Sequence, residues 1–154
     1  ERVGLRGEVS GHEKSLAGTA KKAGAENYAF FQNQGYRGLY NLSLNELRQL
    51  KHVPDGRSPL DFMGAEELGA NIFRVTQTEA KLRRDRITGQ KPAEAAAWDV
   101  GRKVRETIES IGGTMPEELG PTEDIRKIQS DLKKTNRGFL KGDTVGLPKS
   151  KDKA

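Results

Sequence analysis

The sequence contains no cysteine, which excludes disulfide bonds and metal sites built from thiolates. It has two histidines, His12 and His52, and neither has a partner at the spacing of a metal site. No apolar run approaches the roughly 20 residues that cross a bilayer. Nucleophile elbows, phosphate-binding loops and dinucleotide-binding loops are also missing. We therefore expect a non-enzymatic protein without a metal, a cofactor or a membrane partner.

Apolar residues are also scarce. They make up 33% of the 154 residues, while charged residues make up 32%. A core built from so few apolar side chains is thin, and helical stripes supply it better than a broad sheet. No stretch of length alternates strictly between apolar and polar residues, as a half-buried strand does. The composition and the pattern together predict an all-α fold.

Helical spacing and helix-start signals cover most of the chain. Residues 1–24 have the spacing of a helix, although several glycines weaken it. Residues 25–40 contain most of the aromatic residues, and we expect Gly35 and Gly38 to break this segment. Ser43 and Glu46 form a capping box that begins a short helix. Further on, Thr122 is predicted to cap a final helix.

The two longest predicted helices span residues 65–86 and 92–112. The second has the more regular apolar stripe, formed by Val100, Val104, Ile108 and Ile111. Because a short loop joins the two helices, we expect them to pair as a long antiparallel hairpin in a compact domain. Their stripes are thin, so a second copy is expected to complete the core in a homodimer.

The positive charge is concentrated at the C-terminus. The net charge is +5, and the residues from Lys133 onward include seven Lys or Arg and two Asp or Glu, which gives 7 − 2 = +5. The preceding residues are therefore neutral overall. We predict a helical domain over residues 1–136 and a disordered basic tail over residues 137–154. Such a tail either follows phosphates or only aids solubility.

Two clusters of cations are candidates for contacts with phosphate. The candidate residues are Arg74, Lys81, Arg83, Arg84 and Arg86 on the first long helix and Arg102, Lys103 and Arg105 on the second. The alternative is that these are solvated helix faces, with the cations neutralised by nearby acids. The acids close enough in sequence are Glu79, Asp85, Asp99 and Glu106.

Three strings in the sequence resemble a known family. They are "FFQNQGYRGLY", "MGAEELGANIFRVTQTEAKLRRD" and "VGRKVRETIESIGGTMPEELG". Their order and spacing resemble the C-terminal region of the DNA-damage-inducible protein D (DinD) family, over residues 2–136. The resemblance implies a role in the bacterial SOS response, in the cytoplasm and at the nucleoid. It also implies a link to the RecA recombinase, because the family is described as inhibiting strand exchange and disassembling RecA filaments.

The resemblance also concerns what lies outside the sequence. The family pattern begins with a domain similar to the BRO N-terminal domain of phage and viral proteins. We expect that domain to be absent here, because the sequence begins at Glu1 and is expected to be a fragment or a processed product. A looser similarity to a damage-response protein of radiation-resistant bacteria, whose helical half dimerises, favours a helical dimer.

Two functions remain open from the sequence. In the first, the chain is a dimeric damage-response module whose cations contact the phosphates of DNA, a recombinase filament, or both. In the second, it is a protein–protein or dimerisation module of a phage-type, antirepressor-like regulator. The segment "GGTMPEELGP" is then a candidate docking loop with Met115 and Leu119 as apolar contacts, although both could instead close the core.

Overall fold

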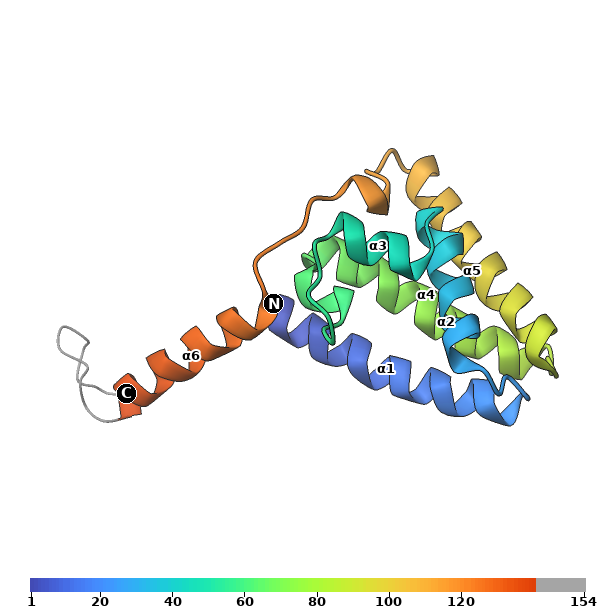
Figure 1. Cartoon of the computed structure of the whole chain (residues 1–154), viewed down its shortest axis with the longest axis horizontal. Coiled ribbons are helices and arrows are strands. Elements are labelled where there is room, and N and C mark those ends of the chain that lie inside the picture. The colour runs from blue at the N-terminus through green and yellow to red at the C-terminus, as the bar shows by residue number, and fades with distance from the viewer. Residues whose placement is uncertain (141–154) are drawn as a thin grey trace.

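The computed structural model describes residues 1–140, and this part of the chain is entirely helical (Figure 1). The helices are α1 (Arg2–Lys22), α2 (Tyr28–Tyr40), α3 (Leu44–Leu50), η1 (Pro59–Phe62), α4 (Ala65–Arg84), α5 (Gln90–Ser110), η2 (Pro116–Glu118) and α6 (Ile125–Leu140), where η marks a 3₁₀ helix. No strand occurs within residues 1–140, which confirms the predicted all-α class. None of the described helices has the length and apolar character needed to cross a membrane.

Side chains at the helix starts explain several boundaries. The Ser43 side chain accepts a hydrogen bond from the Glu46 amide (3.1 Å), and the Glu46 side chain accepts one from the Ser43 amide (2.8 Å). This confirms the predicted capping box of α3. Asn27 caps α2 by accepting a hydrogen bond from the amide of Phe30 (3.1 Å). Local sequence therefore determines where these helices begin.

Apart from α6, the four longest helices form two V-shaped pairs, α1 with α2 and α4 with α5. The two pairs lie against each other, with their bends at the same end of the molecule (Figure 1). Arg2, at the start of α1, donates to the Met63 carbonyl just before α4 (2.6 Å). Thr19, near the end of α1, accepts from Arg83, near the end of α4 (3.1 Å). The bends of the two pairs also meet, since the Gly89 amide donates to the Ala23 carbonyl (2.6 Å).

This arrangement differs from the predicted hairpin. A short loop joins α4 and α5, as expected, but the two helices diverge from it in Figure 1. The principal packing partner of α4 is α1, and that of α5 is α2. The predicted antiparallel pairing is not confirmed. On the face that α5 presents to α2, glycines allow the two helices to approach closely.

Glycines form the crossing between α2 and α5. A Cβ atom on Gly38 would lie 2.3 Å from the Trp98 carbonyl oxygen. One on Gly101 would lie 2.7 Å from the Gly35 carbonyl oxygen. The prediction that Gly35 and Gly38 break the aromatic segment is therefore wrong, because both lie inside α2. Each glycine costs about 1 kcal/mol of helix propensity, and close helix packing offsets this cost.

The core consists of two apolar clusters joined by buried polar groups. One cluster includes Leu39 and Leu68, and the other includes Phe31 and Val75. Polar groups also occupy the core, because apolar residues are few. Lys51 and Glu67 form a fully buried ion pair, in which the Lys51 Nζ lies 2.7 Å from the Glu67 Oε1.

The buried pair belongs to a larger hydrogen-bonded network. Tyr40 donates its hydroxyl proton to Glu67, and Asn71 donates to the Tyr40 oxygen (3.0 Å). Burial raises the pKa of Glu67, while the hydrogen bonds from Lys51 and Tyr40 oppose this shift. The network thus places a carboxylate and an ammonium group where an apolar core would be expected.

The last helix, α6, projects from the body (Figure 1). Its start is not capped by Thr122 as predicted, because the Asp124 carboxylate accepts from the Arg126 amide (2.9 Å). The helix reaches Leu140, so residues 137–140 are helical and not disordered as predicted. The physical reason is that α6 as a whole is rich in Lys, Arg and Leu, which favour helix, so one Gly138 does not end it. The rest of the predicted tail, residues 141–154, lies outside the described residues.

Candidate nucleic-acid interface

Arg74 does not belong to the surface on which the sequence placed it. Its side chain is buried, with 3% of the residue exposed. The guanidinium donates two hydrogen bonds to the Asn71 Oδ1 (3.0 and 3.2 Å) and lies 4.6 Å from the centre of the Tyr36 ring. A Cβ atom on Gly35 would lie 2.5 Å from this guanidinium, so the glycine provides the space for it. Arg74 is therefore a core residue and cannot contact phosphate in this structure.

Arg102 and Arg105 connect helices within the domain. Arg105 donates to both carboxylate oxygens of Glu117 (2.7 and 2.6 Å) and to the Leu39 carbonyl (3.1 Å). The hydrogen bonds that Arg105 donates to Glu117 raise the pKa of Arg105, and its side chain is only 14% exposed. Arg102 donates to the Asn41 Oδ1 (2.7 Å) and lies 5.8 Å from the centre of the Trp98 ring. Both arginines thus have intramolecular partners that a phosphate would have to displace.

Three other predicted cations meet at a groove between α4 and α5. Lys81 and Arg84 come from α4 and Lys103 from α5, and the groove has a volume of about 320 Å³. Its remaining lining residues are Phe73, Gln77, Asp99, Val100, Val104 and Thr107. The groove therefore combines an apolar floor with a mostly basic rim.

Two carboxylates neutralise much of that rim. Asp99 lies 3.0 Å from the Lys103 Nζ and 3.9 Å from the Lys81 Nζ. Asp85 lies 3.3 Å from Lys81 and 3.2 Å from Arg84. Hydrogen bonds from Lys81 and Arg84 lower the pKa of Asp85, so it stays ionised at neutral pH. The expected neutralisation by Asp85 and Asp99 is confirmed for this groove.

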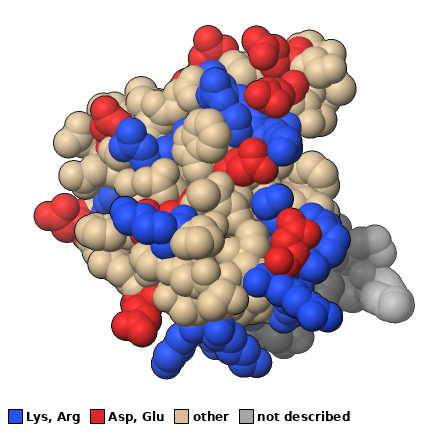
Figure 2. Space-filling model, turned by 90° about the vertical axis from the view of Figure 1, so that its right-hand side faces the viewer, with Lys and Arg blue, Asp and Glu red and all other residues tan. Residues whose placement is uncertain are grey.

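A second set of cations, which shares Arg84 with the groove, gathers where α1 and α4 end. We name this set the apical surface, and its members are Lys21, Lys22, Arg83, Arg84 and Arg86. All of them are exposed. Figure 2 faces this end of the molecule and shows Lys and Arg side chains gathered along its lower and right-hand edges. Within residues 1–140, no carboxylate lies within ion-pair distance of Lys21, Lys22 or Arg86.

A buried carboxylate brings the two helix ends together. Glu79 accepts hydrogen bonds from Ser15 (2.7 Å) and Thr19 (2.8 Å) of α1 and forms an ion pair with Arg83 (2.7 Å). Burial alone would raise the pKa of Glu79, but the two hydroxyl groups and Arg83 lower it. The ionised carboxylate thereby fixes Arg83 against α1. This confirms the expected neutralisation by Glu79 and also aligns the ends of the two helices.

Lys21 and Lys22 were not among the cations predicted from the sequence to contact phosphate. They lie at the end of a predicted helix, and cations at a helix C-terminus are favoured by the helix dipole, so they do not stand out. Their position beside α4 depends on a contact between Thr19 and Arg83, which are 64 residues apart. The consecutive lysines at the end of the first predicted helix were the only signal available in the sequence.

The arrangement offers groups that bind anions. In the described part of the chain, no cluster of three or more His, Asp or Glu side chains is placed to bind a metal ion. The apical surface presents Lys and Arg side chains at the ends of α1 and α4, with Arg86 on the turn that follows α4. Such groups bind anions by charge and by hydrogen bonds, and Arg does so with a forked geometry suited to phosphate.

The model of the DinD C-terminal domain family matches residues 1–128. The chain belongs to the DinD family. It is 44% identical over 142 residues to the DNA damage-inducible protein D of Escherichia coli (strain K12). That alignment covers 89% of the chain and 52% of the relative, so this DinD domain spans about half the length of the relative. No solved structure matches the domain at a significant level.

The match confirms the resemblance carried by the three sequence strings. The family is named for proteins induced by DNA damage, which is consistent with a role in the DNA-damage response. The residues that differ most from the sequence-based expectations, Arg74 and Arg105, lie within the matched region of this DinD domain.

Proposed function

We propose that this DinD domain is a non-enzymatic module of the DNA-damage response that binds the DNA backbone through its apical surface. The observation that carries the proposal is the convergence of five exposed cations from the ends of α1 and α4, of which Lys21, Lys22 and Arg86 have no acidic partner among the described residues. The name of the relative, a damage-inducible protein, supplies the biological setting.

The chemistry favours phosphate as the ligand. DNA carries closely spaced negative charges that are surrounded by condensed counterions. A protein whose unpaired surface cations contact the phosphates gains affinity because these counterions are released from the DNA. Arg84 is paired with Asp85, but it is 65% exposed. An exposed pair contributes little stability, so a phosphate can replace the carboxylate at small cost. Binding of this kind positions a protein on DNA without reading its sequence.

The apical surface includes no aromatic residue that could read bases. Tyr36 and Tyr40 are each buried, and the exposed aromatic residues Phe30, Phe73 and Trp98 are not part of the apical surface. Proteins that bind single strands without sequence preference usually stack bases on exposed aromatic side chains along a basic groove. We therefore propose that the apical surface contacts the backbone alone, without selection of a base sequence.

Fluorescence anisotropy of labelled single-stranded and double-stranded oligonucleotides tests the proposal over a series of salt concentrations. The test variant is Lys21→Ala/Lys22→Ala/Arg86→Ala, and the matched control, Arg126→Ala/Lys133→Ala/Lys134→Ala, removes three exposed cations from α6. We expect the test variant to bind about 10- to 100-fold more weakly than the unmodified chain. Its salt slope should fall by roughly 0.9 for each phosphate that the variant no longer neutralises.

Two outcomes would contradict the proposal. Equal losses of affinity in the test and control variants would show that net charge, and not the apical surface, governs binding. No DNA binding by the unmodified chain would also reject it. If purified RecA-type recombinase then retained the chain without DNA, a protein-docking function would replace DNA binding.

A further inference from the structure

Two exposed aromatic side chains lie on the outer face that α2 and α5 form together. Phe30 of α2 is 61% exposed, and Trp98 of α5 is 42% exposed. A shallow depression of about 360 Å³ between the two helices is lined by Gln34, Lys91, Glu94, Ala95 and Trp98. Phe30 precedes Gln34 by one helical turn, so it lies on the same side of α2 as this depression. Exposed apolar groups among polar ones are typical of a binding surface.

Contacts at both ends show that α2 and α5 run side by side in the same direction. At their starts, the Gln90 side chain accepts a hydrogen bond from the Asn27 amide (2.9 Å) and donates one to the Asn27 carbonyl (3.0 Å). Near their ends, Arg102 donates to the Asn41 Oδ1 (2.7 Å). These contacts join residues 63 and 61 positions apart in the chain. Neighbours on the two helices are therefore separated by about this number of residues.

This separation places a ring beside a cation at two levels of the face. Phe30 lies level with Lys91, and Arg37 lies level with Trp98. On each helix the ring and the cation are seven residues apart, which keeps them on one side and separates them by about 10 Å along the axis. The Arg102 guanidinium lies over the Trp98 ring, 5.8 Å from its centre, and supports it. Rings and cations therefore alternate across the face.

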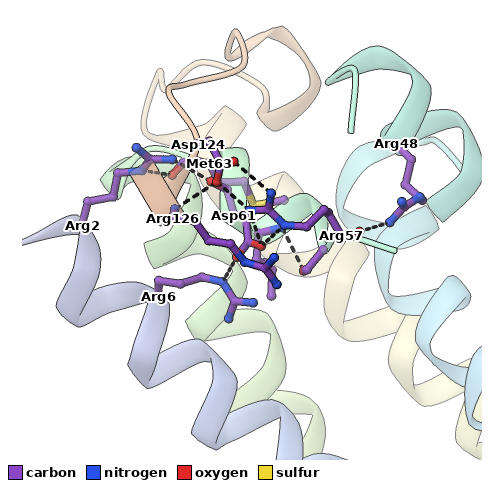
Figure 3. Close-up of polar contacts among 10 residues, drawn as sticks. Arg2, Arg6, Arg48, Arg57, Asp61, Met63, Asp124 and Arg126 are labelled. Carbon is purple, nitrogen blue, oxygen red and sulfur yellow. Dashed lines mark hydrogen bonds and ion pairs between the residues drawn. The ribbon is translucent and has the colours of Figure 1, made fainter. Parts of the chain in front are cut away.

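The two cations of this face are available to a ligand. Arg37 is exposed, and within residues 1–140 no carboxylate lies within ion-pair distance of it. Lys91 is 88% exposed, and its contact with Glu94 is long, at 3.7 Å. At the base of α6, by contrast, Arg57 pairs with two carboxylates at 3.0 and 2.6 Å (Figure 3). The α2–α5 face therefore combines exposed rings with cations that no close carboxylate neutralises.

We propose that this α2–α5 face binds single-stranded DNA by stacking unpaired bases on Phe30 and Trp98 while Arg37 and Lys91 contact the phosphates. A single strand presents planar rings and anions in alternation, as the face presents rings and cations, and every base has a face that can stack. The bases of a duplex already stack on one another, so a duplex cannot bind in this way. The choice of DNA rests on the proposed function, but the face is separate from the apical surface.

Fluorescence of Trp98 tests the stacking directly, because it is the one tryptophan of the chain and a base stacked on an indole ring quenches its emission. The probes are an oligodeoxyadenylate of about 12 nucleotides and an abasic strand of the same length, which has the phosphates but not the bases. We expect the first strand to quench Trp98 and to bind at least about tenfold more tightly than the abasic strand. A duplex of the same length should not quench Trp98.

Substitutions separate stacking from charge. Phe30→Ala should bind the oligodeoxyadenylate about 5- to 100-fold more weakly and leave binding of the abasic strand unchanged. The matched control, Phe73→Ala, removes a side chain that is 49% exposed in the groove between α4 and α5, and it should bind both strands like the unmodified chain. Arg37→Ala should lower the salt slope by about 0.7 for both strands, because one phosphate is no longer neutralised.

Several outcomes would overturn the inference. These are equal affinities for the two strands without quenching of Trp98, equal quenching by the duplex, and equal losses in Phe30→Ala and Phe73→Ala. Tighter binding of an RNA strand of the same sequence would overturn the choice of DNA. Binding of the abasic strand by Lys21→Ala/Lys22→Ala tests the apical surface alone, so the failure of one proposal is distinguishable from the failure of the other.

Discussion

Two groups of cations in this domain have opposite surroundings. At the base of α6, Arg6 and Arg57 share the buried carboxylate of Asp61, at 2.8 and 3.0 Å. At the other end of α1, Lys21 and Lys22 are exposed with no described carboxylate nearby. Both places contain Lys or Arg side chains. The difference shows that the acids brought close by folding, and not the number of cations, decide which cations can bind a ligand.

The two groups also differ in what they contribute to the fold. Removing one partner from a partly buried set of hydrogen bonds between charged groups costs about 1.5 to 3 kcal/mol. Exposed cations contribute little, so their replacement leaves stability nearly unchanged. Cations that stabilise the fold and cations that bind a ligand can therefore be separated by measuring stability and DNA affinity on the same variants.

The largest effect on stability is expected at the most deeply buried cation. Lys51→Met leaves Glu67 in the core without its ammonium partner, which is 2.7 Å away in the unmodified chain. We expect the free energy of unfolding to fall by about 3 to 5 kcal/mol in urea denaturation. The double variant Lys51→Met/Glu67→Gln should recover part of this loss, because no buried charge then remains. A loss below about 1 kcal/mol in the single variant would contradict the account.

A smaller loss is expected when the base of α6 is broken. Arg57→Ala removes the hydrogen bonds to Asp61 and Asp124 and should lower the free energy of unfolding by about 2 kcal/mol. Arg86→Ala, which removes an exposed arginine without an acidic partner among the described residues, should change stability by less than about 0.5 kcal/mol. Chemical denaturation of both variants makes the comparison. Equal losses would mean that the two groups of cations do not differ as described.

The smallest effect concerns pH. The hydrogen bonds from Arg57 lower the pKa of Asp124 from 3.8 to about 2. Since the folded pKa lies below the unfolded one, the contribution is fully present above pH 3.8 and is lost as the pH falls through about 2. Stability of Asp124→Asn should therefore fall less steeply than that of the unmodified chain across this range. Parallel curves in acid titrations of urea unfolding would reject this role for Asp124.

Local features of the fold could be predicted from the sequence, because they depend on neighbouring residues. The all-α class follows from the scarcity of apolar residues and the absence of alternation. The start of α3 follows from Ser43 and Glu46, whose reciprocal hydrogen bonds span three residues. The boundaries of α4 and α5 lie within two residues of those predicted for the two long helices.

Features that depend on distant contacts could not be predicted. Gly38 was interpreted as a helix break, because its role appears only when α5 lies against it. Arg74 has the spacing of a surface residue, but the space left by Gly35 and the ring of Tyr36 place it in the core. The pairing of Arg57 with Asp124 joins residues 67 apart in the chain.

The most direct test compares two double variants that remove the same residue type. Lys21→Ala/Lys22→Ala removes exposed lysines without an acidic partner in the described structure, and Lys81→Ala/Lys103→Ala removes lysines paired with Asp99. The salt dependence of oligonucleotide binding is measured for both. The account predicts that the slope falls by about 1.8 for the first variant and by less than about 0.5 for the second. Equal slopes, or a larger fall for the second variant, would contradict it.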